Sequence, residues 1–204
     1  MMTASYWTIA APSEGQYSQL RSKFIAYALP VQTEEEALEE VARLRQRYYD
    51  ARHVCWAYRL STDGSVTRSN DDGEPSGTAG RPILGQLLSH DLTEVLVVVV
   101  RYFGGVKLGT PGLIEAYRTA AHEALSAAQR LERIVERTLE VDFGYELMGE
   151  VMRLVKDSGA RIREQNFVER CRLLVSLRAD EVETLYARLE RLYGTTLRWC
   201  QEEG

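Results

Sequence analysis

The sequence predicts an α+β protein of two domains, with a ferredoxin-like fold in the second. The chain has 204 residues, which is enough for one or two domains. The apolar pattern resets around Leu131 to Val135, and the elements expected after that point follow the order β-α-β-β-α-β. We therefore expect an N-terminal domain over residues 1–133 and a ferredoxin-like domain over residues 134–204.

The first domain is expected to contain both strands and helices. Strands are predicted at 6–9, 22–29, 54–60, 66–69 and 94–102, and helices beginning at Glu34, Arg81 and Leu113. Thr33 is a suitable N-cap for the first helix. Leu84, Leu87 and Leu88 form the expected buried stripe of the second. Residues 94–102 are almost continuously β-branched, which is typical of a central strand covered on both faces.

In the second domain, arginines lie on two neighbouring predicted strands. Strands are expected at 137–143, 161–167, 169–178 and 196–200, and helices at 146–158 and 180–193. Alternation along a strand places Arg161 with Arg163, and Arg170 with Arg172, on one strand face each. This face is either a solvated sheet surface or the second domain's candidate RNA-contacting surface.

Composition favours a cytoplasmic protein without bound cofactors. The formal net charge is −5 and the pI about 5.4, so nucleic-acid binding would require a local basic patch. The three cysteines lack C-x-x-C spacing and are expected to be reduced thiols, neither a disulfide framework nor a zinc site. The first residues show no basic segment followed by an apolar run, so we expect no secretion signal. No apolar stretch approaches the roughly 18 residues that span a bilayer, so we expect no membrane contact.

One segment, residues 70–82 (NDDGEPSGTAGRP), is named here the acidic loop. Its glycines permit positive φ and its prolines fix φ, so the composition favours a loop of specified shape. Three carboxylates crowd into four positions, and two hydroxyls can bond to nearby backbone. The candidate binding residues are Asp71, Asp72, Glu74, Ser76, Thr78 and Arg81.

A second glycine-rich segment, residues 103–112 (FGGVKLGTPG), is named here the lysine loop. Thr110 is a good N-cap and Pro111 suits the first position of the helix that follows. A glycine-rich turn with Lys107 before exposed helix amides can hold an anion, above all phosphate. The alternative is a tight connection with a solvated lysine. The spacing is not that of a Walker A loop. The candidate anion-binding residues are Arg101, Gly104, Gly105, Lys107, Gly109 and Thr110.

The two loops together permit two interpretations. Asp71, Asp72 and Glu74 can hold Mg²⁺ while the lysine loop holds phosphate. Alternatively, Lys107 or Arg81 pairs with these carboxylates and locks the loops together; this structural pairing is preferred, and no metal ligands are assigned.

A nucleophile–base pair is not expected. His53 and Cys55 share one strand face, but their Cα atoms lie roughly 7 Å apart, too far for a reliable hydrogen bond. We expect partly buried core residues and assign no catalytic residue.

Long ordered motifs connect this chain to a known family. The string D-D-G-E-P-S-G-T-A-G-R-P, followed by V-V-V-V-R-Y-F-G-G-V-K-L-G, resembles the signature of the IMPACT family, with the bacterial YigZ branch most similar. S-K-F-I-A, H-V-C-W-A-Y and the pair Ala116-Tyr117 add to the resemblance, which covers roughly Ser22 to Tyr117. Pro111 stands where glycine is expected and Glu115 where arginine is expected, which weakens the anion-site prediction.

The resemblance implies both fold and function. It implies domains like IV and V of elongation factor G, the first a mixed β-sheet with helices on one face. Eukaryotic members are tied to translational control during amino-acid starvation, through protein partners, and bacterial relatives have been thought to bind nucleic acid or ribosomes. We expect a non-enzymatic translation-associated regulatory protein that contacts RNA or the ribosome. The alternatives are a Mg²⁺-dependent enzyme or binder of a small phosphorylated, nucleotide-like ligand, and a regulator acting through a protein partner.

Overall fold

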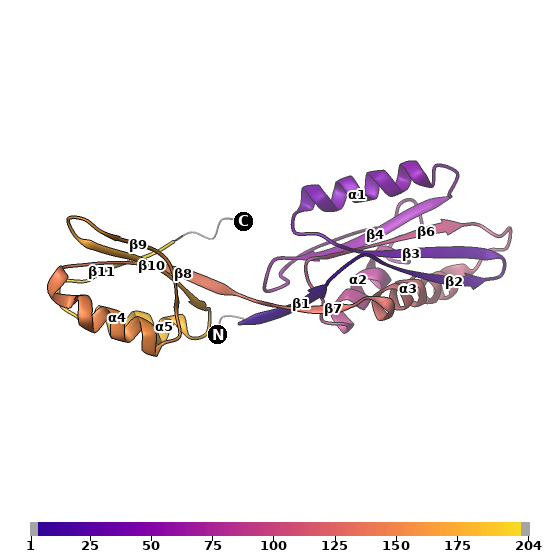
Figure 1. Cartoon of the computed structure of the whole chain (residues 1–204). Coiled ribbons are helices and arrows are strands. Elements are labelled where there is room, and N and C mark those ends of the chain that lie inside the picture. Colours follow the sequence, from indigo (N-terminus) through magenta and orange to yellow (C-terminus); the bar gives the residue numbers. More distant parts are fainter. Residues whose placement is uncertain (1–3, 201–204) are drawn as a thin grey trace. The chain divides into compact units, whose positions relative to one another are not determined.

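The computed structural model describes residues 4–200, which divide into two compact units. The N-terminal domain is Tyr6–Arg133, and the C-terminal domain consists of residues 134–200 with residues 4–5. Both combine helices with sheet, so the predicted two-domain α+β fold is confirmed (Figure 1). No helix within residues 4–200 is long and apolar enough to cross a membrane.

A five-stranded sheet forms the centre of the N-terminal domain. Its strands are β2 (Ser13–Gln19), β3 (Ser22–Pro30), β4 (His53–Leu60), β5 (Val66–Asn70) and β6 (Val95–Tyr102). They follow the order β2-β3-β6-β4-β5, and every pair of neighbours is antiparallel. In this detail the expectation of a mixed sheet is corrected, because hairpins join β2 to β3 and β4 to β5.

The helices of this domain cover both faces of the sheet. Helices α2 (Gly80–Ser89) and α3 (Gly109–Ala127) lie on one face, and α1 (Glu34–Arg47) lies on the other (Figure 1). The expectation of helices on one face alone is therefore also corrected. Strand β6 shows the reason: Val97 and Val99 pack towards α2 and α3, while Val98 and Val100 pack towards α1. A strand buried on both sides needs apolar residues at successive positions, as its sequence predicted.

Helix ends and buried faces agree with the sequence only in part. The Thr33 hydroxyl accepts the amide of Glu36 and caps α1, as predicted. On α2, Ile83 and Leu87 are buried, but Leu88 is 52% exposed. Leu88 was therefore wrongly predicted as buried, and Ile83 takes part in the buried face. Helix α3 begins at Gly109, which places Thr110 in its first turn and corrects the prediction of Thr110 as N-cap.

Two polar strands are absent from the predictions. Strand β7 (Arg130–Ile134) pairs with β1 (Ser5–Ile9) in a two-stranded sheet, at the point where only a pattern reset was recognised. Strand β2 is an edge strand of mostly polar residues. Its Gly15 lies against α3, where an added Cβ would be 2.3 Å from the Ala124 nitrogen. Close backbone packing replaces the apolar side chains that would reveal such a strand.

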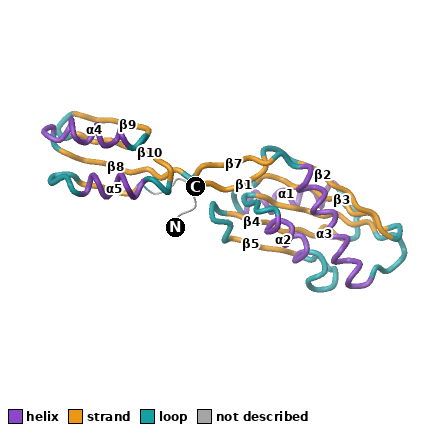
Figure 2. Tube along the Cα trace, turned by 90° about the horizontal axis from the view of Figure 1, so that it is seen from below, coloured by secondary structure: helices purple, strands orange, loops and turns teal. Residues whose placement is uncertain are grey.

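The C-terminal domain has the predicted ferredoxin-like arrangement. Its strands are β8 (Glu136–Phe143), β9 (Arg161–Phe167), β10 (Cys171–Arg178) and β11 (Thr196–Trp199); its helices are the 3₁₀ turn η1 (Tyr145–Leu147), α4 (Met148–Asp157) and α5 (Val182–Glu190). The sheet order is β11-β8-β10-β9, antiparallel throughout. Helices α4 and α5 cover one face of the sheet (Figures 1 and 2).

Candidate functional site

The acidic loop and the lysine loop meet at a cavity of about 600 Å³. Glu74 and Pro75 line it from the acidic loop, and residues 107–110 line it from the lysine loop and the start of α3. Arg52 and His53 reach it from the beginning of β4. The two unusual segments of the sequence therefore contribute to one site.

Asp71 fastens the acidic loop to the start of α2. Its Oδ1 accepts the backbone N–H groups of Ala79 (3.0 Å) and Gly80 (2.8 Å), and its Oδ2 accepts that of Gly77 (2.8 Å). Partial burial raises the pKa of the Asp71 carboxyl. These three amides and the Arg81 charge together lower the pKa by more than burial raises it, so the net pKa is below its usual range. Both oxygens of Asp71 are committed to the loop itself.

Asp72 fastens the same loop to the sheet and to α1. Its Oδ2 accepts the amide of Val54 (2.6 Å), and its Oδ1 accepts Arg45 Nη2 (2.8 Å). Its backbone oxygen lies 2.7 Å from His53 Nδ1. Asp72 has φ of +45°, a conformation that is uncommon outside glycine and in which Asn and Asp are enriched.

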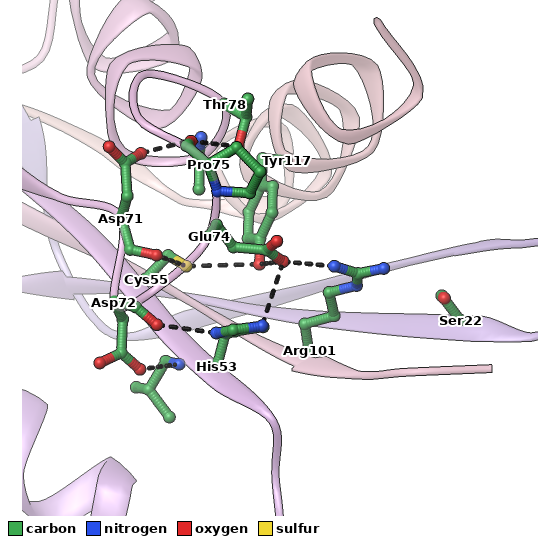
Figure 3. Close-up of polar contacts among 12 residues, drawn as sticks. Ser22, His53, Cys55, Asp71, Asp72, Glu74, Pro75, Thr78, Arg101 and Tyr117 are labelled. Carbon is green, nitrogen blue, oxygen red and sulfur yellow. Dashed lines mark hydrogen bonds and ion pairs between the residues drawn. The ribbon is translucent and has the colours of Figure 1, made fainter. Parts of the chain in front are cut away.

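Glu74 is the buried charge at the centre of the site. Its Oε1 accepts Arg101 Nη1 (2.5 Å) and the Tyr117 hydroxyl (2.8 Å), and His53 Nε2 lies 3.8 Å away. Figure 3 shows these side chains directed at the Glu74 carboxylate. Glu74 and Arg101 are 8% and 5% exposed, so each depends on the other for neutralisation.

Cys55 lies behind this network and is not placed for nucleophilic chemistry. Its thiol donates to the Asp71 backbone oxygen (3.0 Å) and lies 3.3 Å from the Tyr117 hydroxyl. Burial raises the pKa of Cys55 far above its ordinary value, and burial likewise raises that of Tyr117. The thiol is therefore protonated at neutral pH, as expected for a core residue.

The three carboxylates of the acidic loop do not converge on a metal site. The oxygens of Asp71 and Asp72 accept separate donors, and across residues 4–200 no three His, Cys, Asp or Glu side chains gather where they could hold an ion. As placed here, these three carboxylates therefore do not form a shared site for Mg²⁺. The pairing interpretation holds with different partners: Arg45 and Arg101 pair with the carboxylates, in place of Lys107 and Arg81.

The cationic side of the cavity comes from the lysine loop and from Arg52. Arg52 and Lys107 are exposed, and neither has an ion-pair partner among the described residues. Gly109 and Thr110 line the cavity in the first turn of α3, where backbone amides are free of intrahelical partners. This side therefore carries the features expected for anion binding.

The remaining predicted residues of the two loops differ in their roles. Thr78 is buried and donates to the Pro75 carbonyl (2.7 Å), whereas Ser76 and Arg81 are exposed and do not line the cavity. Gly104 donates its amide to Ser22 Oγ (3.1 Å). Gly105 has φ of +86°, which favours glycine.

Sequence reasoning missed several residues of the site: Arg52, Phe103 and Tyr117 were not among its candidates. Tyr117 had a signal, since the pair Ala116-Tyr117 belongs to the recognised motifs. Arg52 had none, because its position depends on how the end of α1 leads into β4.

Three of the four predicted arginines of the C-terminal domain lie beside carboxylates of β8. Arg163 Nη2 is 2.8 Å from Glu136 Oε2, and its Nε donates to Ser176 Oγ (2.9 Å). Arg170 and Arg172 both contact Asp142, and Arg172 is also 3.9 Å from Glu140. This sheet face presents mixed charge in which the basic groups are largely balanced.

Comparison with known proteins gives consistent results. The model of the "Impact N-terminal domain" matches residues 20–125. YigZ of Escherichia coli is 35% identical over 188 residues, covering 90% of this chain and 91% of its own, and YvyE of Bacillus subtilis is 35% identical over 168 residues, covering 82% and 77%. A crystal structure titled as that of a hypothetical protein is 30% identical, with a TM-score of 0.70 and coverage of 99% and 100%. The chain belongs to the IMPACT family, in its bacterial branch.

Proposed function

We propose that this protein is a cytoplasmic, non-enzymatic regulatory protein associated with translation, which contacts RNA or the ribosome through the cavity between the acidic and lysine loops. Membership of the IMPACT family supports the association with translation. The charge of the cavity supports the type of contact.

One observation carries the proposal: positive charge at the cavity is in excess and unbalanced. Glu74 is the carboxylate of the lining, and its charge is balanced by Arg101. Arg52, Lys107 and the amides at the start of α3 then remain for a ligand. Lysine and arginine side chains together with helix N-terminal amides are the groups that contact phosphates of nucleic acids. A local cationic site is also the requirement that an overall acidic protein must meet to bind RNA.

The contact is proposed to be non-catalytic because the candidate reactive groups serve the fold. The Cys55 thiol is buried and protonated, and the acidic-loop carboxylates are engaged by backbone amides and arginines. The groups that remain at the cavity surface, Arg52, Lys107 and the amides at the start of α3, are suited to binding an anion.

A small phosphorylated ligand is the second candidate, favoured by the size of the cavity. A volume of about 600 Å³ lies within the range of about 300–1,000 Å³ typical of small-molecule sites. It would be bound without Mg²⁺ from the acidic loop. A protein partner is the third candidate, and binding to the ribosome with no affinity for ribosomal RNA would favour it.

The test is salt-dependent binding of the full chain to ribosomes and to short structured RNA, from about 50 to 200 mM salt. Lys107→Ala and Arg52→Ala are expected to weaken binding, and each to reduce the salt slope by about 1. Arg43→Ala, on the exposed surface of α1, is the matched control and should change neither quantity. Wild-type binding that is absent at low salt, or unaffected by both cavity variants, would contradict the proposal.

A further inference from the structure

The cavity has two unlike sides, which restricts the kind of ligand that fits it. Phe103, Leu108 and Leu113 provide apolar surface, while Arg52 and Lys107 provide positive charge. A ligand that matches both sides carries an anionic group and an apolar or planar group within a few ångströms of each other. A nucleotide has this combination, with a phosphate at one end and an aromatic base at the other.

Phe103 is an exposed aromatic residue of the cavity lining on which a planar group could stack. It is 48% exposed, and the Arg101 guanidinium lies 5.6 Å from its centroid. The next residue, Gly104, is pressed against the β2–β3 turn: an added Cβ would lie 2.1 Å from the Arg21 carbonyl carbon. Tight packing of Gly104 limits how far the backbone next to Phe103 can move. A preorganised ring loses little entropy when a ligand covers it.

A buried donor beside this ring lacks a partner. Arg101 lines the cavity and is 5% exposed; its Nη1 bonds to Glu74, but its Nε has no hydrogen-bond partner within the described part of the chain. Unsatisfied buried donors are uncommon because each costs free energy, so they merit an explanation. Because Nε is covered from solvent, a ligand acceptor would reach it only after the Arg101 side chain shifts.

We propose that the cavity receives a single unpaired nucleotide of RNA, with its base stacked on Phe103 and its phosphate against Lys107 and Arg52. This inference rests on the proposed function and specifies which feature of RNA is recognised. Unpaired bases can be splayed out and stacked on aromatic side chains, whereas bases inside an A-form duplex are inaccessible. The phosphate provides the salt-dependent part of the affinity and the base provides the preference for single strands.

The experiment compares a labelled single-stranded RNA of about ten nucleotides with the duplex of the same sequence, by fluorescence anisotropy on the full chain. Phe103→Ala is expected to weaken single-strand binding about tenfold and to leave duplex binding within about twofold. Phe103→Tyr keeps a ring and should retain wild-type affinity, and Phe103→Leu keeps apolar bulk and should behave like Phe103→Ala. Tyr49→Ala is the matched control, since Tyr49 is 86% exposed in the same domain and outside the cavity lining.

The outcomes separate this inference from the proposed function. Loss of affinity in Lys107→Ala with no loss in Phe103→Ala or Phe103→Leu would retain the cationic contact and overturn the nucleotide pocket. Equal losses on single strand and duplex in Phe103→Ala would also overturn it. No RNA binding by the wild type would overturn both. Circular dichroism of each variant checks that the fold is intact, and Phe103→Leu, which keeps apolar bulk but no ring, keeps the test decisive if Phe103→Ala fails to fold.

Discussion

The cavity of the N-terminal domain and the open sheet face of the C-terminal domain both carry several basic residues, but they present charge differently. On the sheet face, Arg163, Arg170 and Arg172 lie beside carboxylates of β8. At the cavity, the carboxylate of Glu74 is occupied by Arg101, and Lys107 and Arg52 line the cavity without an ion-pair partner among the described residues. The number of basic residues therefore says less about the positive charge that a surface presents than the positions of the carboxylates beside them.

The largest expected effect concerns the buried pair in the cavity. Glu74→Ala would leave Arg101 buried without its counter-charge, and removing one partner of such a pair costs about 3–5 kcal/mol. Glu140→Ala on the C-terminal sheet removes the partner of exposed arginines and should cost less than about 1 kcal/mol. Urea unfolding of the full chain, followed by fluorescence, measures both. Similar losses in the two variants would remove the distinction between the regions.

The next effect concerns the pH dependence of the acidic loop. Asp71→Asn places an amide donor against three backbone donors, and we expect it to destabilise the protein by about 1–3 kcal/mol at pH 7. Because the folded pKa of Asp71 is lowered, its contribution is present above the unfolded pKa of about 4 and is lost as pH falls through the folded pKa.

The difference between wild type and Asp71→Asn should therefore be full near neutral pH and shrink in acid. Urea midpoints measured from about pH 6 downwards check this, since the unfolded carboxyl titrates near pH 4. Asp142→Asn, whose partners are exposed arginines, is the control and should have a smaller effect at neutral pH. A difference that grows as pH falls would contradict the role given to Asp71.

The smallest expected effect concerns the C-terminal sheet face, where the carboxylates beside the arginines are removed. Replacing Glu140 and Asp142 together by Gln and Asn would release Arg170, Arg172 and Arg198 from their acidic neighbours. We expect RNA affinity to rise a few-fold at low salt, with a salt slope steeper by about 1–2. Unchanged affinity would show that the carboxylates are not what limits this face.

The sequence predicted what depends on local pattern. The apolar run of β6, the Thr33 cap and the βαββαβ order each follow from spacing and residue type, and all are present in the structure. The acidic loop was recognised because Gly, Pro and carboxylates crowd together there. Strand β2 was not predicted, because it packs on α3 at Gly15, and glycine contributes nothing to an apolar sequence pattern.

The chemistry of the site could not be predicted, because it depends on pairings between distant segments. Arg45 and Asp72 are far apart in sequence, as are Glu74 and Arg101, and only the fold brings them within hydrogen-bond distance. The carboxylates that suggested Mg²⁺ are thereby engaged in holding the loop. The same argument applies to three of the C-terminal arginines: Arg163 and Arg172 lie on the predicted strands and Arg170 lies just before β10, while the carboxylates on β8 decide how much charge these three present.

The most direct measurement compares the salt slope of ribosome and RNA binding for two double variants of the full chain. Arg52→Ala/Lys107→Ala removes the unbalanced charge at the cavity, and Arg163→Ala/Arg172→Ala removes the same number of charges from the sheet face. We predict that the first reduces the slope by about 2 and weakens binding, while the second leaves both close to wild type. The reverse result would place the RNA contact on the C-terminal domain and contradict the account given for the cavity.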